Sequence, residues 1–77
     1  MSDDELKAIH DKHFDAGLAK AKATPDFAQI APDRQALRIT NEVCDLVKRD
    51  IGTYGKDRDQ REVMNDYVMG KAMAVLS

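Results

Sequence analysis

The chain has 77 residues, of which 43% are hydrophobic and 34% charged, a composition typical of one globular domain rather than of a disordered segment. Its 14 acidic and 12 basic side chains give a formal net charge of −2. This balance disfavours a general affinity for nucleic acid or anionic membranes, because there is no excess of cations to replace counterions.

The sequence also indicates the cellular compartment. A single cysteine, Cys44, excludes an intramolecular disulfide. The acidic start from Ser2 to Glu5 differs from the basic and then apolar pattern of a secretory signal. No apolar run approaches the roughly 18 residues that a membrane span needs. We therefore expect a cytoplasmic protein.

The first expected helix covers residues 3–23. Ser2 and Glu5 fit a capping box, in which each residue bonds the backbone of the other at a helix start. At about 100° per residue, the inner face contains few large aliphatic side chains, and its glycine would let another backbone approach closely. The inner face comprises Leu6, Ile9, His10, His13, Phe14, Gly17 and Ala21.

Residues 25–31 separate this helix from the next. Thr24 and Pro25 are typical of an N-cap and a first helical residue, and Pro32 ends whatever begins there. The segment therefore forms at most one or two helical turns, and an irregular linker is the alternative. Its two large apolar side chains would cover the end of the core: Phe27 and Ile30.

The second expected helix covers residues 33–51, after Pro32, and Gly52 suits the left-handed conformation that often ends a helix. Its apolar stripe is wide enough, about 160° of the helical wheel, to contact two other helices. The inner face comprises Ala36, Leu37, Thr40, Val43, Cys44, Val47 and Ile51, flanked by Ile39 and Leu46.

The third expected helix covers residues 58–76, with Asp57 as its N-cap and Gln60 reaching back to it. One apolar stripe would dock on the core: Val63, Met64, Tyr67, Val68, Ala74 and Val75. A second series lies on roughly the opposite side: Met69, Ala72, Met73 and Leu76. A surface helix needs only one apolar face, so the second series is the main indication of function.

These elements predict an all-α fold: a small three-helix bundle forming one domain over residues 1–77, with or without a short fourth helical turn at 25–31. The second series has two interpretations. Either the last helix is central and covered on both sides by its own chain, or the second series binds a partner or another copy of the chain. We favour the second interpretation, because methionine side chains adapt to varied surfaces.

Two histidines stand one turn apart on the first helix. His10 and His13 could share a metal ion, but metal sites usually need three or four ligands and neither Glu5 nor Asp11 clearly shares their face. We expect instead that both imidazoles lie at the edge of the core and bond neighbouring groups. A contact sensitive to pH is a further alternative, because histidine titrates near neutrality.

No catalytic arrangement is evident. Cys44 lies in an apolar stripe, without the base and the electropositive, open setting that a nucleophile needs. Gly52 to Lys56 superficially resembles a phosphate loop but has the wrong spacing and no preceding strand, so we expect a helix connection there. Tyr54, within it, would either fold back on the core or contact a partner. We therefore predict a protein that is not an enzyme and needs no cofactor.

Basic residues gather around the junction of the second and third helices. They could contact nucleic acid, as in helix-turn-helix proteins, although this connection is longer than the usual three or four residues. The first turns of the third helix also alternate acidic and basic residues, which suits a solvated face. The basic residues are Lys48, Arg49, Lys56, Arg58 and Arg61.

Three hypotheses follow, in order of preference. The first is a regulatory or accessory module that binds another protein or itself through the last helix and Tyr54. The second is a nucleic-acid-binding regulator that uses the basic junction. The third is a metal-binding helical protein that uses His10 and His13.

Overall fold

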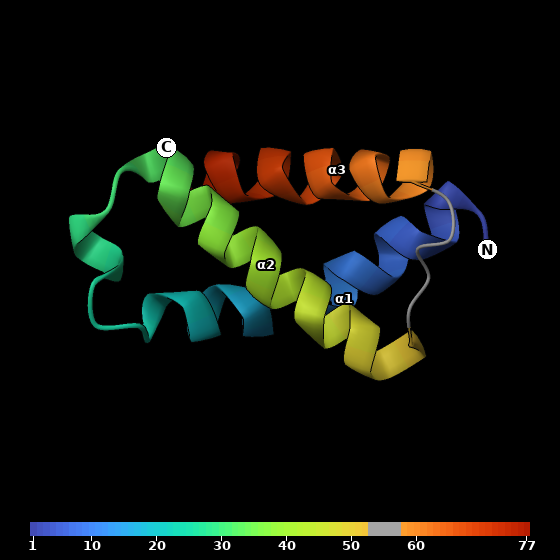
Figure 1. Cartoon of the computed structure of the whole chain (residues 1–77), viewed down its shortest axis with the longest axis horizontal. Coiled ribbons are helices and arrows are strands. Elements are labelled where there is room, and N and C mark those ends of the chain that lie inside the picture. The colour runs from blue at the N-terminus through green and yellow to red at the C-terminus, as the bar shows by residue number, and fades with distance from the viewer. Residues whose placement is uncertain (53–57) are drawn as a thin grey trace.

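Three α-helices and one short 3-10 turn form the described part of the chain (Figure 1). The computed structural model describes residues 1–52 and 58–77. The elements are α1 (Asp3–Lys22), η1 (Phe27–Gln29), α2 (Pro32–Ile51) and α3 (Arg58–Leu76). The predicted all-α three-helix bundle is confirmed, and each helix begins and ends within one residue of its predicted position.

The helices alternate in direction. α2 runs back along α1, and α3 runs in the same direction as α1, so that the C-terminal end of α3 lies beside the start of α2 (Figure 1). The bundle is elongated, with extents of 36 × 20 × 18 Å. None of these helices, over the described residues, is long and apolar enough to cross a membrane.

Local signals explain the helix ends. The Ser2 hydroxyl accepts from the backbone N–H of Glu5 at 3.2 Å, and the Glu5 carboxylate accepts from the N–H of Ser2 at 3.4 Å, which confirms the capping box. Pro32 is the first residue of α2, and Gly52 follows its last turn with φ of 75°. Such a φ favours glycine because a side chain would be strained there. The predicted Asp57 cap lies outside the described residues.

The start of the segment between α1 and α2 differs from its prediction, because the helical turn begins at Phe27 and not at Pro25. The segment contains the single turn η1, with Phe27 buried beneath it. Thr24, however, is not an N-cap for this turn, because its hydroxyl donates to the carbonyl of Ala21 at 2.6 Å. The side chain of Thr24 therefore satisfies the end of α1 instead of the start of η1.

α1 and α2 approach each other closely at Gly17. A Cβ atom built on Gly17 would lie 2.9 Å from the backbone nitrogen of Val43 and would also meet a Val43 methyl group. The expectation that another helix approaches closely at Gly17 is thus confirmed. The fully buried apolar side chains of the core are Leu6, Ala21, Ala36, Ile39, Val43, Val47, Met64, Val68 and Ala72.

Two helix faces are rotated from their predicted orientation. In α2, Ile39 was expected at the edge but is fully buried, whereas Leu37 was expected inside and is 52% exposed. In α3, Val63 and Val75 were expected in the core but are 41% and 46% exposed, and Ala72 from the second series takes a core position. The small side chain of Ala72 lets α3 lie close to the rest of the core.

Candidate protein-binding surface

The side of α3 that faces α1 is held by polar contacts around Asp11. The Tyr67 hydroxyl donates to Asp11 at 2.8 Å, and the Lys71 ammonium donates to it at 2.5 Å. The Lys71 nitrogen also lies 4.6 Å from the centre of the Phe14 ring, a cation–π distance. We call Asp11, Tyr67 and Lys71 the α1–α3 clamp.

Contacts within the clamp shift the pKa values of Asp11 and Tyr67. The hydrogen bond from Lys71 is the main reason why the pKa of Asp11 is lowered, and the bond to Asp11 is the main reason why the pKa of Tyr67 is raised. Near neutral pH Asp11 is therefore a carboxylate and Tyr67 an uncharged phenol. These contacts form a polar bridge between α1 and α3.

A polar contact also connects α3 to α2. The Cys44 thiol donates to the side-chain oxygen of Asn65 at 3.4 Å, near the middle of both helices. One turn further along α3, Met69 is half-buried and lines an open hollow on the outside of α2. Met73 follows one more turn along on the same side of α3 and is 44% exposed.

This outer hollow has a volume of about 860 Å³. Its apolar lining consists of Ile30, Leu37 and Met69. Its charged lining consists of Asp26, Asp33, Arg34, Arg38 and Glu42. The hollow lies over the first half of α2. Its lining comes from the residues on either side of η1, from α2 and from α3, so three parts of the chain form this surface.

One pair of charges in the hollow is neutralised internally. The Arg38 guanidinium donates to both carboxylate oxygens of Asp26, at 2.6 and 3.3 Å, and to the hydroxyl of Thr24 at 3.0 Å. These bonds lower the pKa of Asp26 and raise that of Arg38. They also fix the segment before η1 against α2.

The structure divides the residues that were predicted to bind a partner. Met69 lines the hollow, Met73 is exposed one turn beyond it, and Leu76 is half-buried against the core. Ala72 is fully buried by its own chain and is not available to a partner. Tyr54 lies outside the described residues.

The two histidines have different partners. The His10 ring is buried and its Nδ1 donates to the carbonyl of Leu6 at 2.7 Å, within the same helix. His13 bonds Asp50 on α2 through Nε2 at 2.8 Å, and this contact is the main reason why the pKa of Asp50 is lowered. Over residues 1–52 and 58–77, no group of three or more potential ligands is placed to hold a metal ion.

The basic residues at the α2–α3 junction are solvated. Lys48 and Arg49 are exposed on the last turns of α2, and Arg61 is exposed on α3. Arg58 donates to Glu62 at 3.2 Å, so its charge is partly compensated within its own helix. Lys56 lies outside the described residues.

Sequence reasoning missed the residues that α2 contributes to the hollow. Leu37 was placed in the core, and neither Arg34 nor Glu42 was considered for a site. The width of the apolar stripe on α2 could have indicated that one of its edges, where Leu37 lies, stays exposed, but no local signal indicated the charged residues. Comparison of the chain with family models, with curated proteins and with solved structures gave no match in any of the three.

Proposed function

We propose that this protein is a non-enzymatic interaction module that binds another polypeptide chain through the outer hollow and the adjoining exposed side of α3. The bound chain is either a second copy or a different protein. The proposal modifies the prediction from the sequence in one way: the binding surface includes α2 as well as the C-terminal helix.

One observation carries the proposal. Leu37 is 52% exposed within a helix whose other large aliphatic side chains are buried or half-buried, and it lines the same hollow as Met69. Exposed apolar side chains are common singly, but several around one concave surface are typical of a binding site for a partner. Met73 extends this surface along α3.

The chemistry of the surface suits a helical or extended peptide segment. Apolar side chains at helical spacing on a partner would enter the hollow, as in other complexes in which a helix binds a groove. The charged residues around the hollow would supply a polar rim, which is the usual surround of an interface core. Methionine at positions 69 and 73 suits such a site because its unbranched side chain adapts to the shape of a partner.

Site-specific photocrosslinking tests the proposal. A photoreactive amino acid replaces Leu37 in one variant and Met73 in a second, and both are irradiated in living cells. A third variant carries it at Ala16, an exposed position on α1, as the matched control. We expect discrete adducts of defined mass from positions 37 and 73 and none from position 16. Circular dichroism of each purified variant verifies the helical fold.

Two results would contradict the proposal. Folded variants that give no adduct at position 37 or 73 would show that the surface is free in the cell. Equal adducts at all three positions would show unspecific collision. A loss of the adducts in a Leu37→Asp background, with the photoreactive group at 73, is the expected result if both positions belong to one surface.

A further inference from the structure

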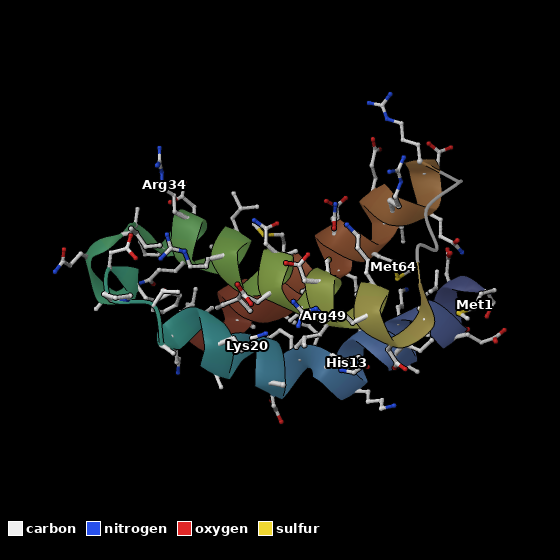
Figure 2. The ribbon with its side chains drawn as sticks, turned by 60° about the horizontal axis from the view of Figure 1, so that its bottom comes forward. Met1, His13, Lys20, Arg34, Arg49 and Met64 are labelled. Carbon is white, nitrogen blue, oxygen red and sulfur yellow. The ribbon has the colours of Figure 1, made fainter. Side chains whose placement is uncertain are left out.

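The hollow contains two charged residues of opposite sign that its own chain leaves without an ion pair. Of its charged lining, Asp26 and Arg38 neutralise each other, and Asp33 lies in the first turn of α2, where a negative charge is favourable. Arg34 and Glu42 make no ion pair within 4 Å of any residue in the described ranges, although the charge of Glu42 contributes, after Asp26, to raising the pKa of Arg38 one turn away. Arg34 is also directed away from the body of the protein (Figure 2).

These two residues lie at equal intervals on either side of Arg38 along α2. Arg34, Arg38 and Glu42 succeed one another at intervals of four along α2, so they form one ridge on the helix surface. The ridge is positive at its start, internally neutralised at its centre and negative at its end. When two such ridges run in opposite directions, each positive end meets a negative end.

We propose that the outer hollow is covered by the same face of a second copy of this chain, with the two α2 helices antiparallel and Arg34 of each copy opposite Glu42 of its partner. The inference rests on the proposed function and specifies the bound chain. A two-fold axis near Arg38 generates both charge pairs at once, as a self-complementary interface requires. It also brings the exposed Leu37 of each copy toward the apolar lining of the other.

The neutralised centre makes this arrangement feasible. Two Arg38 side chains would meet near the axis, and their repulsion is offset because each is bound by an Asp26 carboxylate in its own chain. The apolar lining is limited to Ile30, Leu37 and Met69. The dimer is therefore weak, with a dissociation constant on the order of 100 µM, as suits a small interface.

Charge reversal and mixing test the geometry. The variants are Arg34→Glu and Glu42→Arg, measured by sedimentation equilibrium alone and mixed in equal amounts. Alone, each variant places like charges opposite each other twice, and we expect its association constant to fall about tenfold relative to wild type. In the mixture both pairs are attractive again, so the heterodimer forms with about the affinity of the wild type. High salt should reduce these differences.

Control variants separate this effect from net charge. Lys20→Glu and Asp15→Arg make the same charge changes as the two test variants at exposed positions of α1, and we expect association like that of wild type. A Leu37→Asp variant should associate more weakly than wild type, because the apolar contact across the axis is lost.

Each alternative outcome overturns the inference. A wild-type chain that stays monomeric at millimolar concentration excludes the second copy. A wild-type dimer whose single variants are not restored by mixing excludes the antiparallel arrangement. The proposed function is tested separately: adducts from position 37 to a different protein, with a monomeric purified chain, would retain the module and refute only the self-association.

Discussion

The two interfaces that hold this bundle together differ in construction. α1 and α2 approach so closely that Gly17 has no room for a side-chain carbon beside Val43. α3 packs its central stripe of Met64, Val68 and Ala72 on this pair, and polar groups connect its two sides to α1 and α2. The α1–α2 interface depends on a close fit between backbones, whereas the interface of α3 with this pair combines a narrow apolar stripe with polar bridges.

This difference explains where apolar surface remains exposed. A close helix pair buries the side chains between its two axes and leaves those on the outer edge, such as Leu37, uncovered. A third helix with a narrow stripe covers only one groove of that pair, so Met73 and Val75 also remain exposed near its end. The bundle has too few residues to cover all of its apolar side chains, and those that remain exposed form part of the surface that we propose for binding.

The largest expected effect is a loss of stability that distinguishes a core position from a surface position. Val43→Asp places an unpaired charge at a fully buried position, and we expect it to destabilise the fold by about 4 kcal/mol or more, enough to unfold a domain of this size. Met73→Asp, at a 44% exposed position, should leave the helical circular dichroism and the melting temperature nearly unchanged. If Met73→Asp unfolds the protein, α3 is more central than its contacts indicate.

A pair of glycine substitutions contrasts the two interfaces directly. Gly17→Ala should destabilise the fold by about 2 kcal/mol, because the backbone of Val43 cannot move aside as a flexible side chain would. Gly70→Ala should instead stabilise it by about 0.5–1 kcal/mol, since alanine favours the helix and nothing lies within 4 Å of the added carbon. Urea unfolding of both variants measures this, and a stabilising Gly17→Ala would contradict the close approach.

Asp11→Asn weakens the α1–α3 clamp alone. We expect a loss of about 1 kcal/mol in the free energy of unfolding, because the ion pair is partly exposed and screened by solvent. Asp15→Asn, one turn along α1 and exposed, is the matched control and should change little. A loss as large as that from Gly17→Ala would mean that the clamp, and not the apolar stripe, dominates the docking of α3.

The same substitution should alter the response to acid. The folded pKa of Asp11 is lowered, so the folded protein binds fewer protons there than the unfolded chain. The contribution of Asp11 is therefore complete above the unfolded pKa of about 3.9 and is lost as the pH falls through the lower folded value. Wild type should lose more stability than Asp11→Asn over that acid range, and parallel curves would contradict this.

The smallest expected effect is spectroscopic. The raised pKa of Tyr67 predicts that its phenolate forms above pH 10, the ordinary value for tyrosine. In a Tyr54→Phe background, which leaves Tyr67 as the only tyrosine, ultraviolet titration reports this group alone. Adding Asp11→Asn should bring the midpoint back toward 10. An unchanged midpoint would show that the hydroxyl does not bond Asp11.

The positions of the helices were predictable because each depends on neighbouring residues. The capping box at Ser2, the proline at position 32 and the glycine at position 52 act within one or two turns, and all three functioned as expected. The role of Thr24 differed, because its hydroxyl donates to the carbonyl of Ala21 at the end of α1 and does not cap the segment that follows.

The orientation of the helix faces was harder to predict. A wide apolar stripe such as that of α2 shows which residues are apolar, but it does not show which part of the stripe contacts a neighbouring helix. The close approach at Gly17 selects the Ile39 side of α2 and leaves Leu37 outside. In α3, residues that look equivalent on a helical wheel were separated by contacts far apart in sequence, which no local pattern contains. The candidate site was consequently predicted in part on α3 and missed on α2.

The bond between Gln60 and the first residues of the chain has a consequence for folding kinetics. Gln60 donates to the carbonyl of Met1 and to Asp3, and the clamp joins Asp11 to Lys71, so the polar contacts of α3 with α1 span 56 to 60 residues. Contacts this distant in sequence form late, after the local hairpin of α1 and α2, because closing a long loop is entropically costly. Weakening them should therefore accelerate unfolding and leave the folding rate nearly unchanged.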